Sequence, residues 1–115
     1  MVCGASRSNR AQALLYRSKD MLHWEFFNVL AESGANGAIC GSVRIFILLV
    51  TNSVLMFSPM GAGERTVVYL VGDFDYETGK FDYHVNGEID WGFDYYAPQS
   101  FEAPDGRRII VGWAN

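Results

Sequence analysis

Residues 66–85, TVVYLVGDFDYETGKFDYHV, constrain the fold more than any other part of the sequence. Apolar and aromatic residues follow one another over 67–71 and predict a β-strand, and 81–85 alternate as a returning strand would. Between them, YETGK at 76–80 has the length of a hairpin turn, with Gly79 available for a positive φ. The segment therefore predicts an antiparallel hairpin whose second strand ends at Asn86-Gly87.

Short apolar runs separated by turn residues continue along the chain. Residues 12–18 form such a run, 53–59 predict a strand broken by Pro59 to Gly63, and 98–103 and 107–114 flank a turn at 104–106. Strands of about five to six residues with such frequent turns predict an all-β sandwich, barrel or propeller. A propeller blade takes about 40–50 residues, so a single domain over 1–115 would hold about two to three blades of a larger ring.

Composition and charge exclude several classes of function. The net charge is −4, and no run of Lys and Arg exceeds two residues. This argues against a nucleic-acid surface and against a basic membrane-binding patch. Cys3 and Cys40 lack metal-ligand or disulfide-framework spacing, and the N-terminus lacks the layout of a signal peptide. We therefore expect a cytoplasmic setting.

An oily stretch at 37–57, GAICGSVRIFILLVTNSVLMF, differs from its neighbours. Its strictly apolar core, IFILLV, is far shorter than the roughly 20 residues that span a bilayer, and Arg44 precedes it. A membrane segment is therefore the least favoured interpretation, which leaves a buried strand or an altered stretch of sequence.

Candidate chemistry based on residue types alone is weak. Gly61-Ala62-Gly63 lacks the lysine of a phosphate loop and is expected to be a turn. His23 and His84 have no ligand partners at metal spacing, so we expect both on strand surfaces and predict no metal or cofactor. Carboxylates amid aromatic residues suit sugar chemistry, because acids catalyse glycosyl transfer and rings stack on sugar faces. They gather at Asp73, Asp75, Glu77, Asp82, Glu88, Asp90 and Asp94.

Four segments in register resemble glycoside hydrolase family 32, which contains the invertases and sucrose-6-phosphate hydrolases. They are ALLYRSKDMLHWEF (13–26), VLMFSPMG (54–61), YLVGDFDYETGKF (69–81) and DWGFDYYAPQSFEAPDGRRIIVGWAN (90–115). The resemblance covers nearly the whole chain outside about 38–53. It implies part of a five-bladed β-propeller and the retaining hydrolysis of β-fructofuranosides, with two carboxyl groups about 5–5.5 Å apart.

The resemblance also implies that the catalytic carboxylates are missing. The family's nucleophile lies in an Asn-Asp-Pro-Asn motif, a second Asp in Arg-Asp-Pro, and the acid/base Glu in Trp-Glu-Cys-Pro-Asp. None of these motifs occurs in the sequence. We therefore assign no catalytic residue and expect no sucrose hydrolysis by this chain.

Codon regrouping links the missing glutamate to the oily stretch. Residues 38–46 can be encoded so that another reading frame gives Tyr-Met-Trp-Glu-Cys-Pro-Asp-Phe, and 47–52 can continue as Tyr-Pro-Leu-Gly-Asp-Lys. We hypothesise two compensating frameshifts, near 34–38 and 52–54. The Glu codon would then straddle Gly41 and Ser42, and neither residue can replace the carboxylic acid.

By resemblance, Asp94, Tyr96 and Trp113 match positions that line the sugar site. Each has an alternative role, since Asp94 could cap a turn and Trp113 could pack between blades. The expected partners are a fructoside substrate of the parent enzyme and the missing propeller blades. A non-catalytic glycan-binding or scaffold module remains the alternative function, and a five-bladed glycosidase acting on arabinan or xylan remains the alternative parent activity.

Overall fold

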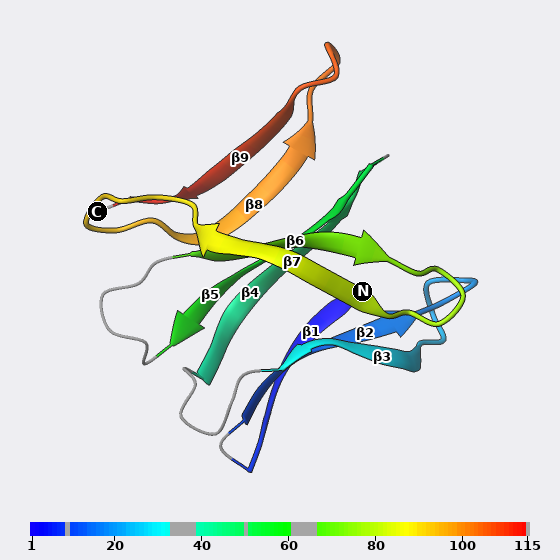
Figure 1. The fold of residues 1–115 in the computed structure, drawn as a ribbon. Coiled ribbons are helices and arrows are strands. Elements are labelled where there is room, and N and C mark those ends of the chain that lie inside the picture. Colours follow the sequence, from blue (N-terminus) through cyan, green and yellow to red (C-terminus); the bar gives the residue numbers. More distant parts are fainter. Residues whose placement is uncertain (9, 33–38, 50, 61–66, 115) are drawn as a thin grey trace.

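A computed structural model describes residues 1–8, 10–32, 39–49, 51–60 and 67–114, with the side chains of 39–45 and 60 excepted. Within these residues the chain is all β and contains no helix (Figure 1). This confirms the predicted fold class. The strands are β1 (Val2–Arg7), β2 (Arg10–Arg17), β3 (Glu25–Glu32), β4 (Ile39–Leu48), β5 (Ser53–Met60), β6 (Val68–Phe74), β7 (Phe81–Glu88), β8 (Tyr96–Glu102) and β9 (Arg108–Trp113).

The strands form three antiparallel sheets that follow one another along the chain. β1 to β3 form the first sheet, β4 to β7 the second, and β8 with β9 the third. The second sheet contacts the other two, since β4 lies against β1 and β2 and β8 lies against β4 and β5. Figure 1 shows the second sheet lying between the first and the third. Successive antiparallel sheets packed in this way are propeller blades, which agrees with the predicted partial β-propeller.

Both faces of the second sheet are covered around β5 and β6, and this explains the long apolar runs of these strands. Leu55 and Leu70 belong to one core cluster with residues of the first sheet, including Leu30. The next residue along β5, Met56, belongs to a second cluster that packs against Ile110 of the third sheet. Because successive strand residues point to opposite faces, a strand covered on both sides needs apolar residues at consecutive positions.

The same rule applies to the oily stretch. Residues 39–48 form β4, which pairs antiparallel with β5, and Phe46 packs on the first cluster while Ile47 is buried in the second. The stretch is therefore a strand over 39–48, with burial shown at Ile47 and partial burial at Phe46. Among the described residues, none belongs to a helix long and apolar enough to cross a bilayer.

The hairpin turns lie where the sequence predicted them. Gly79 has a φ of 71° and donates its N–H to the Asp75 carbonyl at 2.8 Å. Gly106 has a φ of 84° and donates to the Ala103 carbonyl at 2.9 Å. Both values lie in the left-handed region that glycine adopts without a steric penalty, so the β6–β7 and β8–β9 hairpins are confirmed.

The predicted strand at 53–59 is confirmed and runs one residue further, to Met60, with Pro59 paired to Cys40 of β4. The predicted end of the 81–85 strand at Asn86-Gly87 was wrong, because β7 continues to Glu88 instead of turning there. A Cβ at Gly87 would lie 2.6 Å from the Tyr69 hydroxyl oxygen, so this glycine admits an aromatic ring. The predicted turn at 61–63 lies outside the described residues.

The first cluster provides a stability test. Leu55 is fully buried, so Leu55→Ala is expected to lower the free energy of unfolding by about 2–5 kcal/mol through lost transfer energy and a residual cavity. Leu22→Ala removes the same atoms from a side chain that is 80% exposed and serves as the control. Urea unfolding of both variants measures the difference. Equal losses would contradict the assignment of Leu55 to the core.

Candidate functional site

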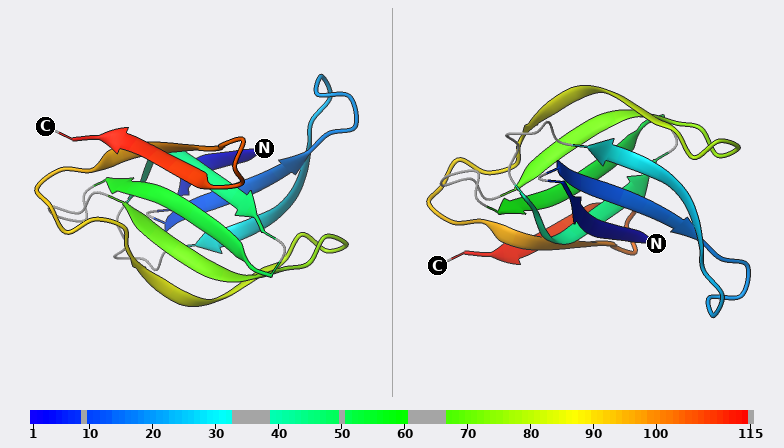
Figure 2. Two further views of the ribbon diagram at one scale, coloured as in Figure 1. Left: turned by 90° about the horizontal axis from the view of Figure 1, so that it is seen from above. Right: turned by 90° about the horizontal axis from the view of Figure 1, so that it is seen from below.

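The structure brings the three predicted sugar-site residues to one end of the molecule. Tyr96 is the first residue of β8, and its register partner is Trp113, the last residue of β9. Asp94 lies two residues before Tyr96, in the segment that leads into β8, and is exposed. In Figure 2 this segment and the end of β9 lie together at the end of the molecule opposite the 18–24 and 75–80 loops.

A bulge fixes the start of β8 against the second sheet. The register of β8 with β9 shifts between Tyr96 and Gln99, and Ala97 has a φ of 50°. The Ala97 N–H donates to the Oγ of Ser58 at 3.1 Å, and Ser58 is fully buried on β5. A non-glycine residue at positive φ is uncommon, and here a buried hydrogen bond holds it. The bulge therefore sets how Tyr96 leaves the sheet.

The neighbouring Tyr95 points the other way, into the core. It packs on the second cluster, and a Cβ at Gly112 would lie 2.6 Å from its Cζ atom. Burial raises the pKa of the Tyr95 hydroxyl above its ordinary value, and the negative charge of Asp90 adds to the effect. Tyr95 thus anchors the segment, and Tyr96 is the tyrosine left beside Trp113.

The turn before β8 is capped by Asp90. Its Oδ2 accepts the Gly92 N–H at 2.8 Å. Among the described residues the Asp94 carboxylate makes no hydrogen bond or ion pair, so Asp90, and not Asp94, performs the capping that the sequence left open for Asp94. The Asp94 carboxylate is therefore free to accept hydrogen bonds from a ligand.

Two aromatic residues of this segment were missed by the sequence analysis. Trp91 is 86% exposed and Phe93 is 96% exposed, and Trp113 itself is 71% exposed. A contiguous patch of exposed apolar side chains is a common mark of a binding site, so these two rings are added to the candidate residues. Their position inside the WGFDYY run was the available signal, but the pattern does not tell exposed rings from buried ones. Trp113 does not pack between blades in this chain.

The carboxylates that the sequence grouped together are separated by the fold. Asp75 and Glu77 lie in the β6–β7 turn, at the end of the molecule opposite Asp94 (Figure 2). The Asp75 carboxylate accepts from the Thr78 hydroxyl at 2.7 Å and from the Glu77 N–H at 2.8 Å, and these bonds lower its pKa. Asp75 is therefore a turn cap and not a partner for Asp94 in acid/base chemistry.

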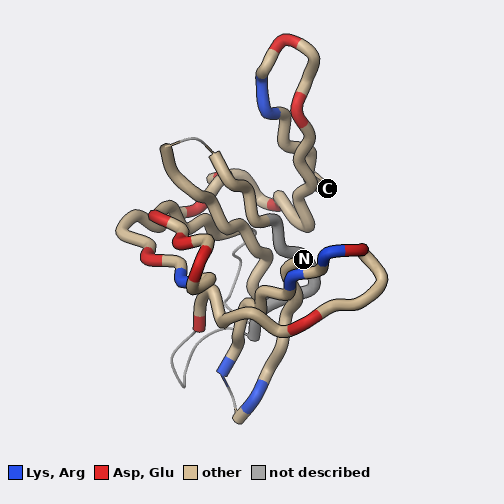
Figure 3. Tube along the Cα trace, turned by 90° about the vertical axis from the view of Figure 1, so that its right-hand side faces the viewer, with Lys and Arg blue, Asp and Glu red and all other residues tan. Residues whose placement is uncertain are grey.

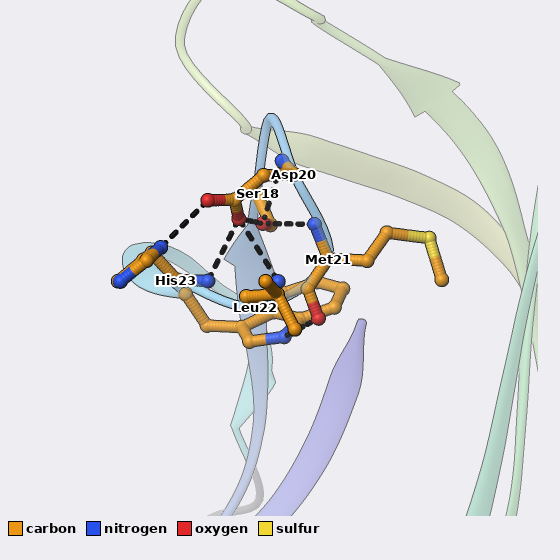
Figure 4. Close-up of polar contacts among 6 residues, drawn as sticks. Ser18, Asp20, Met21, Leu22 and His23 are labelled. Atoms are coloured by element: carbon orange, nitrogen blue, oxygen red, sulfur yellow. Dashed lines mark hydrogen bonds and ion pairs between the residues drawn. The ribbon is translucent and has the colours of Figure 1, made fainter.

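A second polar cluster lies in the loop between β2 and β3 (Figure 4). The Asp20 carboxylate accepts the N–H groups of His23 and Leu22 at 2.8 and 2.9 Å, and its Oδ2 lies 2.6 Å from His23 Nδ1. Met21, at a φ of 62°, donates its N–H to the Ser18 hydroxyl. These hydrogen bonds lower the pKa of Asp20 well below its usual range, and the bond from the His23 N–H has the largest effect.

An open hollow of about 700 Å³ adjoins this loop, lined by residues 17–20 and 23–25. His23 lies in this loop and not on a strand, so its predicted placement was wrong, whereas His84 lies on the exposed surface of β7 as expected. Within the described residues no three His, Cys, Asp or Glu side chains are grouped to hold a metal ion. The hydrogen bonds within the loop explain this cluster as a device that holds the turn, with no need of a ligand.

Comparison with known proteins identifies the family. The model of the glycosyl hydrolases family 32 N-terminal domain matches residues 1–115. The chain belongs to glycosyl hydrolase family 32. Within the family it is 36% identical to a sucrose-6-phosphate hydrolase of Escherichia coli, over 98% of this chain and 26% of that protein. It is also 36% identical to a raffinose invertase of Escherichia coli, over 100% of this chain and 26% of that protein.

Solved structures of the family share the fold. A Bombyx mori GH32 β-fructofuranosidase superposes with a TM-score of 0.86 at 33% identity, over 97% of this chain and 26% of that chain. A variant of that enzyme in complex with sucrose superposes with a TM-score of 0.83 at 32% identity. The chain thus spans about a quarter of the length of these family 32 relatives.

The Asp20 turn gives a pH-dependent prediction. Because the folded-state pKa of Asp20 is lowered, its ionised form stabilises the fold above the usual carboxylate pKa of about 3.9. That contribution is lost as the pH falls through the lowered folded value. Asp20→Asn is therefore expected to lower the melting temperature at pH 7, with a gap to the parent chain that narrows below about pH 4.

Lys19→Gln is the matched control for this measurement. It changes a charge in the same loop and leaves the hydrogen bonds of Asp20 in place. Thermal unfolding followed by circular dichroism, at pH values from about 2 to about 7, compares the melting temperatures of the parent chain and the two variants. A gap for Asp20→Asn that stays constant with pH would contradict the role of the ionised carboxylate.

Proposed function

We propose that this chain is a piece of the catalytic propeller of a β-fructofuranosidase, carrying part of its sugar-facing surface without its catalytic carboxylates. The observation that carries the proposal is the placement of Tyr96 and Trp113 as register partners beside Asp94, at one end of a family 32 fold. An aromatic pair next to an unpaired carboxylate suits a sugar, since rings pack on its C–H faces and the acid accepts from its hydroxyls.

The proposed parent reaction is retaining hydrolysis of sucrose, sucrose 6-phosphate or a related β-fructofuranoside. The names of the relatives support this substrate class, and so does the sucrose bound to a variant of the Bombyx mori enzyme. In such a reaction one carboxylate attacks the anomeric carbon and a second carboxylic acid protonates the leaving oxygen. Asp94 would bind hydroxyl groups and take neither role.

Loss of the catalytic carboxylates removes the chemistry even where binding remains. General acid catalysis contributes roughly 10²–10⁴-fold, and without a nucleophile no covalent intermediate forms. β4 is the strand on which the family glutamate is expected, and it carries Gly41 and Ser42 at that point. Neither residue has a carboxyl group.

We predict that the purified chain does not hydrolyse sucrose. Incubation with sucrose and measurement of reducing sugar should give no turnover above a protein-free blank. The Asp94→Asn variant, run in parallel, separates trace contamination from real activity, because a contaminant would be unaffected by it. Turnover that is above the blank and reduced by Asp94→Asn would overturn the proposal.

The frameshift hypothesis belongs to this proposal and has its own test. Phe46 and Ile47 fit the two buried faces of β4, so the stretch is compatible with the fold whatever its origin. The nucleotide sequence that encodes 34–54 decides the question. We expect codons that regroup to Trp-Glu-Cys-Pro-Asp, and codons that cannot regroup in this way would eliminate the hypothesis.

A non-catalytic glycan-binding or scaffold module is the second candidate, favoured by the exposed rings of Trp91, Phe93 and Trp113. Titration of the isotope-labelled chain with fructose and sucrose tests whether the chain binds sugar by itself. Saturable shifts abolished by Trp113→Ala, but not by Trp24→Ala in the distant β2–β3 loop, would support the binding module, and the absence of shifts would contradict it. We further propose a cytoplasmic setting and the missing propeller blades as the chain's partner.

A further inference from the structure

Asn86 and Gly87 form a dipeptide that is chemically labile in a flexible chain. The sequence contains Asn-Gly twice, at 36–37 and 86–87, and the first pair lies outside the described residues. Glycine has no side chain to shield its main-chain nitrogen, so this nitrogen easily reaches the carboxamide of a preceding Asn. In the turn that the sequence predicted at Asn86-Gly87, the dipeptide would be free to react.

The reaction needs no reagent other than water. The main-chain nitrogen of Gly87 gives up its proton to solvent and attacks Cγ of Asn86. A C–N bond forms, the Cγ–Nδ2 bond breaks, and ammonia leaves, which gives a five-membered imide. Water then opens one of the two imide carbonyls and produces either Asp or isoaspartate at position 86. In isoaspartate the main chain runs through the former side chain and is one methylene longer.

The pairing of β7 with β6 blocks the first step. Ile89 donates its N–H to the Val67 carbonyl at 3.1 Å, and the register continues without a shift through the partners Tyr69 and Gly87. Hydrogen-bonded pairs alternate along an antiparallel ladder, so the Gly87 N–H also faces β6 and donates to the Tyr69 carbonyl. A nitrogen held in this way keeps its proton and cannot turn toward the Asn86 side chain.

Packing holds the glycine while the asparagine stays open to water. A Cβ at Gly87 would lie 2.6 Å from the Tyr69 hydroxyl oxygen, and Tyr69 itself packs on the second cluster. Asn86 is exposed, and its register partner is Leu70 in the alternate, non-hydrogen-bonded type of pair. The carboxamide is therefore accessible, whereas the attacking nitrogen is fixed in the sheet.

We propose that Asn86-Gly87 is a latent modification site, locked while β7 is paired with β6 and converted to Asp or isoaspartate when β7 opens. Conversion to isoaspartate prevents β7 from pairing again in register, because the added methylene moves Gly87 away from the Tyr69 ring. The reaction and its measurement involve no sugar, so this inference does not depend on the proposed function.

The dipeptide lies just before the segment that carries the candidate sugar surface. Ile89 packs on the second cluster, and residues 90–95 follow it directly. A longer main chain at 86 shifts Ile89 relative to Val67 and so loosens the attachment of 90–95 to the second sheet. The modification thus acts on the position of this surface.

The new carboxylate adds a smaller effect of the same sign. The β6–β7 hairpin carries mainly acidic residues (Figure 3), and Lys80 is its one Lys or Arg. The acids are Asp73, Asp75, Glu77, Asp82 and Glu88. A further negative charge at 86 is repelled by these groups, although solvent ions screen the repulsion at the surface.

Reaction rates in the folded chain and in a peptide test the lock. The synthetic peptide YHVNGEI has the sequence of 83–89 and cannot form the sheet. At neutral pH we expect Asn86 in the full chain to react at least about tenfold more slowly than in the peptide, because only the open fraction of β7 reacts. Peptide mapping by mass spectrometry separates position 86 from 36, and Asn86→Gln should abolish the signal. Equal rates would overturn the proposal.

A loosened core tests the link to opening. Leu55→Ala should accelerate the reaction at Asn86, because Leu55 shares a cluster with Leu70 of β6 and Phe81 of β7. Leu22→Ala, in the exposed β2–β3 loop, should leave the rate unchanged. If Leu55→Ala fails to fold, urea below the unfolding midpoint of the parent chain replaces it, and the rate should rise with the urea concentration. A rate that does not respond to opening would contradict the proposal.

Amide hydrogen exchange tests the consequence. In the chain with isoaspartate at 86, purified after ageing, the Ile89 amide should exchange at least about tenfold faster than in the parent. The Asp75 amide, bonded to the Lys80 carbonyl at 2.9 Å at the other end of the hairpin, should be unaffected. Asn86→Asp has the new charge without the added methylene and should keep most of the Ile89 protection. Unchanged exchange at Ile89 in the isoaspartate chain would overturn the proposed loss of pairing.

Discussion

Burial of both faces of the middle sheet is the constraint on which the rest of the structure depends. Leu55 and Met56 are neighbours on β5, yet one packs toward β1–β3 and the other toward β8–β9. No single sheet here is large enough to bury a core alone, so the three sheets are stable only as a stack. This arrangement explains the unbroken apolar runs of β4, β5 and β6, because a strand covered on both faces needs apolar residues at consecutive positions.

The candidate sugar surface is a product of the same stack. The Ser58 hydroxyl, buried between sheets, fixes the bulge at Ala97, and Tyr95 anchors the adjoining segment in the second core cluster. With one tyrosine held inside, Tyr96 is left beside Trp113 at the end of the sheet. The site is positioned by rigid strands, while the loop turns at Asp20 and Asp75 are held by their own hydrogen bonds.

The family 32 relatives of this chain are about four times as long. The surface proposed to contact sugar carries the exposed rings of Trp91, Phe93 and Trp113 together with the exposed carboxylate of Asp94. Rings and one carboxylate can bind a sugar, whereas retaining hydrolysis needs a pair of catalytic carboxyl groups.

Local chemistry was enough to predict the all-β class, the left-handed glycines at 79 and 106 and the hairpins they close, because turn geometry is decided by a few neighbouring residues. It failed at Gly87, which is a glycine because the Tyr69 ring of the adjacent strand lies against it. It also failed at the acidic cluster, because its members lie at opposite ends of the molecule. Tertiary structure alone decided the register that pairs Tyr96 with Trp113 and the exposure of Trp91 and Phe93. Each depends on which sheet lies against which, and contacts between distant segments leave no local pattern in the sequence.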